Sequence, residues 1–554
     1  MDSAELHDAV IAFQKQIDVT FNLALVQNPF GDFLVTILTD DSLEFAKDHI
    51  TRFYDTDFYP KPYEFDAIWY CWEAVKKDLL SKNIDKMSLH PPRAFPWKKP
   101  RNGYRIVHQL EPIDTIIYTA LAYQVSAKIE SARVPEEFGV ACAYRINVSD
   151  GSFFSAGSGY DQFREFSKDI ALRKEFVLLT DIADFYNQIY LHRLNNAIEH
   201  ASPKLKNIAD DIENFLTRLN DKASQGIPVG PAASIVMAEA TLTDVDQYII
   251  DLKVEHTQYV DDFRIFSSDK HELESVLQSL TLYLYKNHRL SLSTEKTMIL
   301  SSKELIEKLE NPYEIEKIEV IEEIEILDPY NNEVVDIFYI EDEEKSHQLV
   351  VEKVTTAFES MVKKSPLDLG FTRALIRQAK ARKIEELIPT ITGNFDYFLP
   401  VVNNIILYLN DVTNDKTLPI LTKFFSKWVV SNSTQNELPR YWVEWYLTKY
   451  PEFLKNNLIS DFLFSSPNVI TQARAAVLQN NLSWIRSRKS QMLTSGSWER
   501  RAILYASQIL PTDERKHWLL QIEKDSPYIL DKCISIWLIK KPKEYDDFED
   551  DIPF

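Results

Sequence analysis

The sequence predicts an α+β segment followed by an all-α domain of helical repeats (HEAT-like), and two observations lead to this. Between residues 176 and 300, short apolar runs such as FVLLTDI alternate with helical stretches, a pattern typical of α+β domains. Beyond residue 346 strand signals nearly vanish, and short amphipathic segments follow one another, separated by Pro, Asn, Asp or Ser. This spacing predicts a helical-repeat array, although no exact sequence repeat is visible.

Composition and charge fit a globular protein. Of the 554 residues, 45% are hydrophobic and 26% are charged, which excludes wholesale disorder. The 62 basic and 84 acidic residues give a net charge of −22. Since phosphate binding needs a basic surface, wrapping of long duplex DNA is disfavoured unless basic residues gather locally. Only 11 glycines occur, which argues against an all-β plan with many tight turns.

Cysteine usage and hydropathy indicate a cytoplasmic protein. The three cysteines lie far apart and form no CxxC pair, so neither a disulfide framework nor a Cys-rich zinc site is expected, and a reducing compartment fits. The N-terminus lacks a basic stretch followed by an apolar core, and no segment approaches 18 uncharged apolar residues. We therefore expect neither a signal peptide nor a membrane span.

Helical periodicity dominates the N-terminal region. Apolar residues at three- and four-residue spacing predict helices over residues 41–54 and 63–80, with Asp41 or Ser42 as the N-cap of the first. A long amphipathic helix is expected to begin at Pro112, since proline is favoured in the first turn.

Acidic side chains dominate residues 304–344, where only Lys308 and Lys317 oppose them. The alternation in EIEKIEVIEEIEIL predicts an edge strand or a small hairpin, and the charge predicts a solvated boundary. The tail EYDDFEDDIPF is also acidic. We therefore expect an acidic connector with short strands before the helical domain.

Three carboxylates stand out in the α+β segment. Asp181 follows the apolar run FVLLT at a predicted strand end. Asp261 and Asp262 lie in YVDDF between two β-like runs, where a hairpin turn would present both. Carboxylates from adjacent strand ends can hold two Mg²⁺ (or Mn²⁺) ions, which activate an attacking oxygen and stabilise a leaving one in phosphoryl transfer. Taken alone, the Asp-Asp pair is better explained as turn residues.

Two further blocks are ambiguous by themselves. In QGIPVGPAAS (225–234), Gly226 and Gly230 would let the backbone approach a ligand closely, but the block is also explained as a loop before a helix. In LSLSTEKT (290–297), Lys296 is also explained as a solvated surface lysine.

The order and spacing of these blocks resemble the palm of a reverse transcriptase. Separations of 44, 36 and 35 residues divide Asp181, Gln225, Asp261 and Lys296. TDIADFYNQI is similar to motif A of that family, QGIPVGP to motif B, YVDD to motif C and LSLSTEKT to motif D. Upstream, KKPRNGYRIVHQLEPIDTIIYTAL resembles the fingers region and AYRI its terminal arginine motif. The resemblance covers roughly residues 90–300.

This resemblance implies a nucleotidyltransferase, a DNA polymerase that acts on dNTPs with two Mg²⁺ (or Mn²⁺) ions. It also implies four regions. They are an N-terminal helical and fingers region (1–175), a polymerase palm (176–302), an acidic connector with short strands (303–345) and an α-helical repeat domain (346–554).

Roles for individual residues follow from the same resemblance. Asp181, Asp261 and Asp262 correspond to the catalytic, metal-binding aspartates. Lys296 corresponds to the motif D lysine, which neutralises or protonates the leaving pyrophosphate. Tyr186 falls where the family places the aromatic gate against a ribose 2′-OH, a role that is compatible with ordinary core packing.

Further nucleotide contacts are implied in motif B and in the fingers. Gln225 and Gly226 would line the nucleotide site. Arg105 lies in the basic segment 98–105 and would clamp the incoming triphosphate, because a guanidinium group suits bidentate phosphate binding. The alternative for this segment is a basic surface patch.

Within the family, the chain resembles bacterial abortive-infection (Abi) polymerases and related defence-associated reverse transcriptases. The cysteine count excludes a Cys/His nuclease module, no ribonuclease H constellation follows the palm, and the VTG motif of retrons is absent. Fingers and palm followed by helical repeats imply untemplated DNA synthesis, primed by a protein hydroxyl, in a homo-oligomer that defends bacteria against phage. The product would be single-stranded DNA attached covalently to the protein.

Two alternatives stay open. One is a reverse transcriptase templated by a partner noncoding RNA, and the other is a non-catalytic scaffold with a degenerate palm. The intact Asp181, Asp261 and Asp262 count against the scaffold.

Tyr54 and Tyr59 are the expected priming residues. They lie in FYDTDFYPKPYEF, whose prolines indicate a loop, and a phenol on a loop can enter and leave an active site. Tyr70 lies in a predicted helix and is expected to pack in the core.

A path for nucleic acid is expected on the helical domain. Arg373, Arg377 and Lys380 share one predicted helical face. A second group mixes cations with aromatic rings, as in proteins that hold single strands: Trp484, Arg486, Arg488, Lys489, Trp498, Arg500 and Arg501. Solvated helix faces are the alternative.

Overall fold

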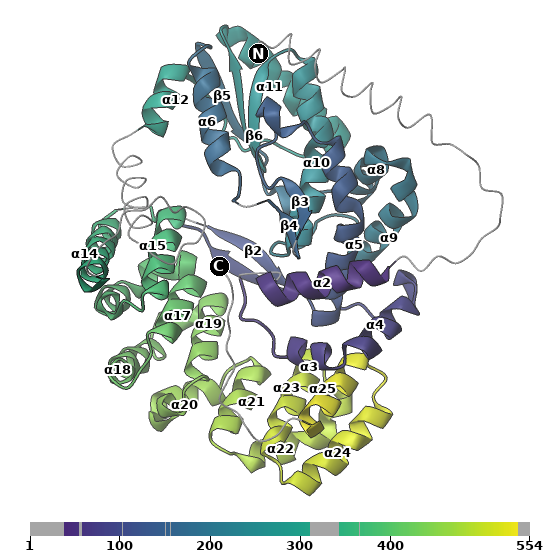
Figure 1. Ribbon diagram of the computed structural model, residues 1–554, viewed down its shortest axis with the longest axis vertical. Coiled ribbons are helices and arrows are strands. Elements are labelled where there is room, and N and C mark those ends of the chain that lie inside the picture. The colour runs from purple at the N-terminus through teal and green to yellow at the C-terminus, as the bar shows by residue number, and fades with distance from the viewer. Residues whose placement is uncertain are drawn as a thin grey trace, which may run out of the picture. The chain divides into compact units, whose positions relative to one another are not determined.

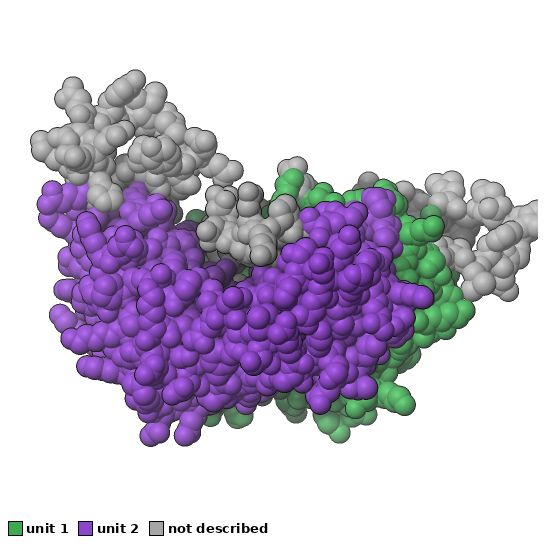
Figure 2. Space-filling view, turned by 90° about the horizontal axis from the view of Figure 1, so that it is seen from below, with its two compact units in different colours: residues 1–56, 76–93, 108–311 green, residues 57–75, 94–107, 312–554 purple. Residues whose placement is uncertain are grey.

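The computed structural model describes residues 38–54, 58–101, 103–149, 151–155, 157–310, 343–364 and 366–540. The chain forms two compact units (Figure 2): unit 1 contains residues 1–56, 76–93 and 108–311, and unit 2 contains residues 57–75, 94–107 and 312–554. Most of the connector expected at 303–345 and the acidic tail lie outside the described residues. None of the described helices is both long and apolar enough to span a membrane.

The first described helix confirms the predicted period but not the predicted cap. Helix α2 (Asp40–Phe53) covers the interval predicted over 41–54 (Figure 1). Its N-cap is Thr39, not Asp41 or Ser42. The Thr39 hydroxyl accepts a hydrogen bond from the Ser42 amide at 3.2 Å, and the Ser42 hydroxyl accepts one from the Thr39 amide at 3.0 Å. This reciprocal pair stabilises the start of the helix one residue earlier than predicted.

Two other predicted helices are present. The segment 63–80 forms two consecutive helices, α3 (Glu64–Tyr70) and α4 (Trp72–Leu80). The long helix expected from Pro112 is α5 (Pro112–Ala132), which packs against α2.

The remaining elements of unit 1 follow in chain order. They are η1 (Ile84–Lys86), η2 (Glu136–Phe138), β3 (Ile146–Ser149), β4 (Ser152–Phe154), α6 (Tyr160–Ala171), β5 (Phe176–Asp181), α7 (Phe185–Gln188), α8 (Leu191–Ala201), η3 (Pro203–Leu205), α9 (Lys206–Leu219), α10 (Ala232–Asp251), β6 (Glu255–Tyr259), β7 (Asp262–Ser267), α11 (Lys270–Tyr283), the π-helical turn η4 (Leu284–His288), β8 (Met298–Ser301) and α12 (Ser302–Leu309).

A four-stranded antiparallel sheet with strand order β6-β7-β5-β8 forms the centre of unit 1. Strands β6 and β7 make a hairpin in which Tyr259 pairs with Asp262. Strand β7 also pairs with β5, and the last pair of that ladder is Asp181 with Asp262. The strands expected from FVLLTDI and HTQYVDDFRIF are therefore present, and they meet in one sheet.

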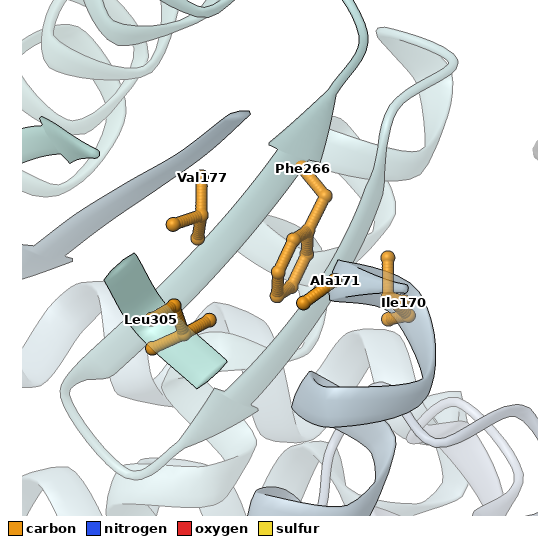
Figure 3. Close-up of a cluster of buried hydrophobic side chains, with 5 residues drawn as sticks. All are labelled: Ile170, Ala171, Val177, Phe266 and Leu305. Atoms are coloured by element: carbon orange, nitrogen blue, oxygen red, sulfur yellow. The ribbon is translucent and has the colours of Figure 1, made fainter. Parts of the chain in front are cut away.

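Helix α6 covers the face of the sheet to which Asp181 points. Alternate residues of a strand point to the same face, and Val177 and Phe266 pair across β5 and β7. These two side chains form a buried cluster with α6 and α12, in which the Phe266 ring is directed toward Ala171 (Figure 3). The other members are Ile170 and Leu305. Asp181 lies four residues beyond Val177 and therefore on the same face.

Unit 2 is mostly helical. Besides α3 and the two-stranded sheet of β1 (Arg93–Lys98) and β2 (Tyr104–Gln109), its described elements are α14 (Glu343–Val362), α15 (Leu369–Ala381), η5 (Glu385–Leu387), α16 (Ile388–Gly393), η6 (Phe395–Val401), α17 (Val402–Asp411), α18 (Leu418–Trp428), η7 (Asn432–Gln435), α19 (Glu437–Leu447), η8 (Pro451–Lys455), α20 (Asn457–Phe464), α21 (Val469–Leu478), α22 (Leu482–Arg488), η9 (Lys489–Thr494), α23 (Ser497–Ala506), η10 (Ser507–Ile509), α24 (Thr512–Asp525) and α25 (Ile529–Lys540). Within 343–364 and 366–540 no strand occurs, as predicted. A HEAT-like repeat stays a prediction.

Segments 57–75 and 94–107 belong to unit 2 because they bond to its C-terminal helices. The Tyr63 hydroxyl donates to the Arg501 carbonyl at 2.7 Å, and the Arg501 guanidinium pairs with Glu64 at 2.7 Å. The Trp97 indole donates to the Pro400 carbonyl at 3.1 Å. The region expected as one N-terminal block (1–175) thus contributes to both units.

Candidate active site

Asp181 and Asp262 stand directly opposite each other in the β5–β7 ladder, so their side chains share one face of the sheet. Asp261 occupies the two-residue turn between β6 and β7, and its carbonyl accepts a hydrogen bond from the Ile182 amide at 3.0 Å. The turn brings the three predicted carboxylates to one end of the sheet. Its other residue, Val260, has a φ of 53°, which a β-branched side chain rarely adopts and which marks local backbone strain.

The loop of motif D is tied to the end of β5. The Ser293 amide donates to the Asp181 carbonyl at 2.7 Å, and the Ala183 amide donates to the Ser291 carbonyl at 2.9 Å. Lys296, at the end of this loop, forms an ion pair with the Asp181 carboxylate. The fourth predicted residue is therefore held at the carboxylates by backbone bonds as well as by charge.

The electrostatics of this cluster show an excess of negative charge. Burial, followed by the charge of Asp261, raises the pKa of Asp262 to about 7, and the charge of Lys296 only partly opposes this shift. Burial alone would lower the pKa of Lys296, but its hydrogen bond with Asp181 and the charge of Asp262 outweigh it, so the Lys296 pKa is raised.

The three carboxylates are ligands of the type that divalent cations prefer. Mg²⁺ and Mn²⁺ prefer carboxylate oxygens. The pKa of Asp262 is raised by burial and then by the negative charge of Asp261, which Lys296 does not fully offset. Among the described residues, no three His, Cys, Asp or Glu side chains converge closely enough to hold an ion. The residues that would hold the ions are Asp181, Asp261 and Asp262, after a side-chain adjustment that draws their carboxylates together.

Motif B lies against the segment that follows motif A. The Ile227 amide donates to the Tyr186 carbonyl at 3.0 Å, and the Gly226 amide donates to the Ile189 carbonyl at 2.8 Å. The Gln225 amide group donates to the Gln188 side chain at 2.6 Å. The structure thus brings Gln225, Gly226 and the half-buried Tyr186 together.

A side chain at Gly226 would strain this contact. Its φ is 91°, and a Cβ there would lie 3.2 Å from the carbonyl oxygen of Asn187. Because only glycine adopts this conformation readily, Gly226 permits the close approach of the two segments.

His108 is a positioning residue that sequence reasoning missed. Its backbone amide donates to the Val229 carbonyl at 2.9 Å, and its ring Nδ1 lies 3.0 Å from the Val229 amide, which donates to it. Burial lowers the pKa of His108 to about 4, which keeps the ring neutral and Nδ1 able to accept. A single histidine in a strand-like run carries no sequence signal for this role.

Both tyrosines expected to prime synthesis are buried. Tyr54 is 7% exposed, and Tyr59 is 1% exposed with its hydroxyl donating to the Val107 carbonyl at 2.8 Å. Tyr70, expected in the core, is 52% exposed. The predicted order of accessibility is therefore wrong, because the proline-rich segment around Tyr59 is covered by tertiary packing while Tyr70 points away from its helix's buried face.

The other predicted residues lie in unit 2. Arg105 is exposed on β2, as is Arg377 on α15. Arg500 and Arg501 are buried and paired with Asp531 and Glu64, so their expected place on a nucleic-acid path is wrong.

Several other cations of the expected path are also paired. Lys380 lies 3.5 Å from Asp411, and Arg486 and Lys489 both bind Glu514. Arg488 stacks over Trp484 at 4.4 Å. Arg373 is half-buried on the same helix as Arg377.

Comparisons with known proteins identify part of the chain. Residues 98–325 match the family described as "Reverse transcriptase (RNA-dependent DNA polymerase)", a span that contains all four palm motifs. No curated protein matches the chain.

Similar solved structures include three telomerases. Telomerase from Candida albicans with the TWJ fragment of telomeric RNA shares 13% identity over 68% of this chain and 71% of that chain, with a TM-score of 0.30. Apo telomerase from Candida tropicalis shares 10% identity over 68% and 72%, with a TM-score of 0.30. The C. tropicalis enzyme with the TWJ fragment shares 11% identity over 71% of each chain, with a TM-score of 0.32.

Proposed function

We propose that the chain is a DNA polymerase that joins dNTPs into a single strand without a template. Its residues 98–325 match the reverse-transcriptase family, which indicates a nucleotidyltransferase. In this proposal the first nucleotide is attached to a hydroxyl of the protein. The working form is a homo-oligomer, and the enzyme acts in antiphage defence by abortive infection.

The observation that carries the polymerase proposal is the pairing of Asp181 with Asp262 at the end of the sheet, with Lys296 bound to Asp181. Two divalent ions held by the three aspartates would supply Lewis acidity to the attacking and leaving oxygens of an in-line phosphoryl transfer. The protein's own part is to hold the carboxylates at fixed strand positions and to keep Lys296 beside them.

Lys296 is suited to act on the leaving pyrophosphate. Its raised pKa keeps the ammonium group charged at neutral pH, so it can neutralise the developing negative charge or donate a proton to it. Its side chain is 59% exposed while that of Asp181 is 6% exposed. The lysine can therefore exchange the aspartate for a phosphate oxygen without leaving the site.

Tyr186 is the proposed selector against ribonucleotides. Its carbonyl is bonded to motif B at Ile227, two residues from Gln225. A ring held at this point can fill the space that a 2′-OH would need, and Gly226 keeps the backbone close to the nucleotide. Arg105 is proposed to contact the triphosphate.

Charge supports synthesis without a template. A polymerase that grips a template duplex neutralises many phosphates with lysine and arginine. This chain has a net charge of −22, and in unit 2 Lys380, Arg486 and Lys489 are already paired with carboxylates. Arg373, Arg377 and Arg488 are the remaining proposed contacts for a single-stranded product.

Protein priming, oligomerisation and the defence role rest on the resemblance to abortive-infection polymerases. The helical unit that follows the palm fits that arrangement. Since Tyr54 and Tyr59 are buried, we propose that either would prime only after local opening of its surroundings.

The test is an incubation without template. The purified full chain, treated with nucleases that are then removed, receives labelled dNTPs and Mg²⁺ but no nucleic acid. We expect label that stays with the protein on a denaturing gel and is released by deoxyribonuclease. An Asp261→Asn/Asp262→Asn variant is the matched control and should stay unlabelled.

Each other outcome selects an alternative. Incorporation only after a noncoding RNA is added would replace the proposal by RNA-templated synthesis. Free DNA without a protein adduct would exclude protein priming but keep untemplated polymerisation. No incorporation by a folded protein under any of these conditions would favour the scaffold.

A further inference from the structure

Three tyrosines gather beside the catalytic turn. Tyr259 belongs to the YVDD of motif C and Tyr144 to AYRI, whereas Tyr160 lies outside the motifs, and none of the three has an assigned role. Tyr259 is the last residue of β6, Tyr160 is the first residue of α6, and Tyr144 lies in the loop before β3. The ring of Tyr160 meets that of Tyr259 edge-on, with centroids 5.3 Å apart, and the ring of Tyr144 lies 6.2 Å from Tyr259. We name these three residues the tyrosine platform.

Helix α6 places the platform on the face of the sheet that carries the aspartates. Along this helix, Phe163 lies under the Arg264 guanidinium at 4.0 Å, and Ser167 accepts a hydrogen bond from Arg264 at 2.8 Å. One turn further, Ile170 and Ala171 pack on Phe266 (Figure 3). Because Asp262 precedes Arg264 by two residues, the N-terminal end of α6 lies at the level of Asp262.

The strand register also places Tyr259 on the face of the sheet that carries the aspartates. Tyr259 pairs with Asp262, and Asp262 pairs with Asp181, so these three side chains leave the sheet on one face. The ring on which Tyr160 packs therefore neighbours the carboxylates.

Tyr144 and Tyr259 are half-buried, and Tyr160, which is 47% exposed, is the accessible member of the platform. The backbone before it is fixed, because the Tyr144 amide donates to the Ser158 carbonyl at 3.1 Å and a Cβ on Gly159 would collide with the Cys142 carbonyl oxygen. A ring held in this way loses little conformational entropy when it binds a flat partner.

The chemistry beside the platform selects the partner. Aromatic rings bind the flat, uncharged base of a nucleotide, whereas the neighbouring carboxylates and the ions that they would hold act on its phosphates. Exposed tyrosine rings stack on bases of any sequence. We propose that the tyrosine platform binds the unpaired terminal base of the DNA strand that is being extended, with Tyr160 as the principal contact. This inference rests on the proposed polymerase function and names a binding site for its strand.

The test measures binding separately from synthesis. The full-length chain is titrated, by fluorescence anisotropy in Ca²⁺, into a labelled twelve-nucleotide oligo(dA) with an ordinary 3′ end, and into one with a 3′-terminal abasic site. We expect Tyr160→Ala to weaken binding of the ordinary strand about 10-fold, the scale of one stacked base. Tyr160→Phe and Tyr160→Trp should stay within about 2-fold of the wild type.

The abasic strand and a second tyrosine are the controls. The wild type should bind the abasic strand about as weakly as Tyr160→Ala binds the ordinary one, and Tyr160→Ala should bind both strands equally. Tyr285 is 58% exposed in the same unit and has its ring under Arg289, so Tyr285→Ala should leave both affinities unchanged.

Equal affinities of the wild type and Tyr160→Ala for the ordinary strand would overturn the inference. A loss in Tyr160→Phe as large as in Tyr160→Ala would also overturn it, because the hydroxyl and not the ring would then be the binding group. Failure of the inference leaves dNTP incorporation by the wild type intact. Ring-dependent binding by a protein that never incorporates dNTPs would instead reject the proposed function.

Discussion

Lys296 and Asp181 form an ion pair across 115 residues of sequence, and this contact joins motif D to motif A. Backbone bonds at Asp181 and at Ala183 fix the loop that carries the lysine. The pair therefore belongs to the resting arrangement of the site, in which the lysine balances part of the charge of the carboxylates.

Two substitutions of Lys296 distinguish the role of its charge from its role as a proton donor. If the ammonium group protonates the leaving pyrophosphate, Lys296→Ala should lower the single-turnover rate of dNTP incorporation about 10²-fold. Lys296→Arg should keep the charge but lose most of the proton transfer, and so flatten the alkaline limb of the pH–rate profile. Equal rates in Lys296→Ala and the wild type would contradict the assignment.

Tyr186→Ala should relax sugar selection. Vacating the space beside motif B should raise the use of ribonucleotides relative to deoxyribonucleotides by a factor on the order of 10–200 in kcat/KM, the range typical of a small pocket. Competition between labelled rNTPs and dNTPs measures the ratio. Tyr186→Phe keeps the ring and should leave the ratio near that of the wild type; an unchanged ratio in active Tyr186→Ala speaks against the gate.

Gly226→Ala should disturb motif B. The new Cβ would press on the Asn187 carbonyl in a backbone conformation that alanine rarely adopts, so the free energy of unfolding should fall by about 1 kcal/mol or more. The KM for dNTPs should rise with it. Gly393, the last residue of α16, has open space around it and no positive φ, so the control Gly393→Ala should leave the KM unchanged and should not lower the free energy of unfolding. Urea unfolding and initial rates report the two effects.

His108 should make stability depend on pH. Its pKa is lowered to about 4 in the folded chain, from about 6.5 in an unfolded one. The unfolded state then binds more protons between these values, so stability falls as pH falls from about 6.5 toward 4. From pH 7 to pH 5 the loss should be about 2 kcal/mol.

His108→Gln isolates this contribution, since its amide oxygen can still accept from Val229 but does not titrate. Urea unfolding at pH 7 and pH 5 should show a smaller loss in this variant than in the wild type. Equal losses in the two proteins would mean that the His108 ring protonates as readily folded as unfolded.

The residue pattern within a single segment predicts the strand ends and the turn that carry the carboxylates. The runs FVLLTDI and HTQYVDDFRIF alternate as strands do, so the strand end at Asp181 and the hairpin turn at Asp261 follow from them. The spacing of the motifs then predicts that Gln225 and Lys296 belong to the same site. Side-chain accessibility does not follow in this way. Local pattern distinguishes a loop from a helix, but Tyr59 is buried because of what packs upon it.

The contacts that sequence reasoning missed join residues far apart in the chain. His108 meets Val229, and Tyr160 meets Tyr259, about a hundred positions or more away. The placement of segments 57–75 and 94–107 in unit 2 likewise depends on bonds to residues more than 300 positions distant. No local period encodes such pairs, because either partner could pack against many others.

We expect the carboxylates at the end of the sheet to serve catalysis and not stability. The wild type and Asp261→Asn/Asp262→Asn are therefore compared in two assays, the rate of dNTP incorporation and the urea midpoint of unfolding. We predict a rate loss of about 10³-fold or more. The midpoint should equal or exceed that of the wild type, because removing two charges relieves the burial of charge and the repulsion by Asp261 that together raise the pKa of Asp262. Unchanged incorporation by the folded double variant would contradict the catalytic role of these aspartates.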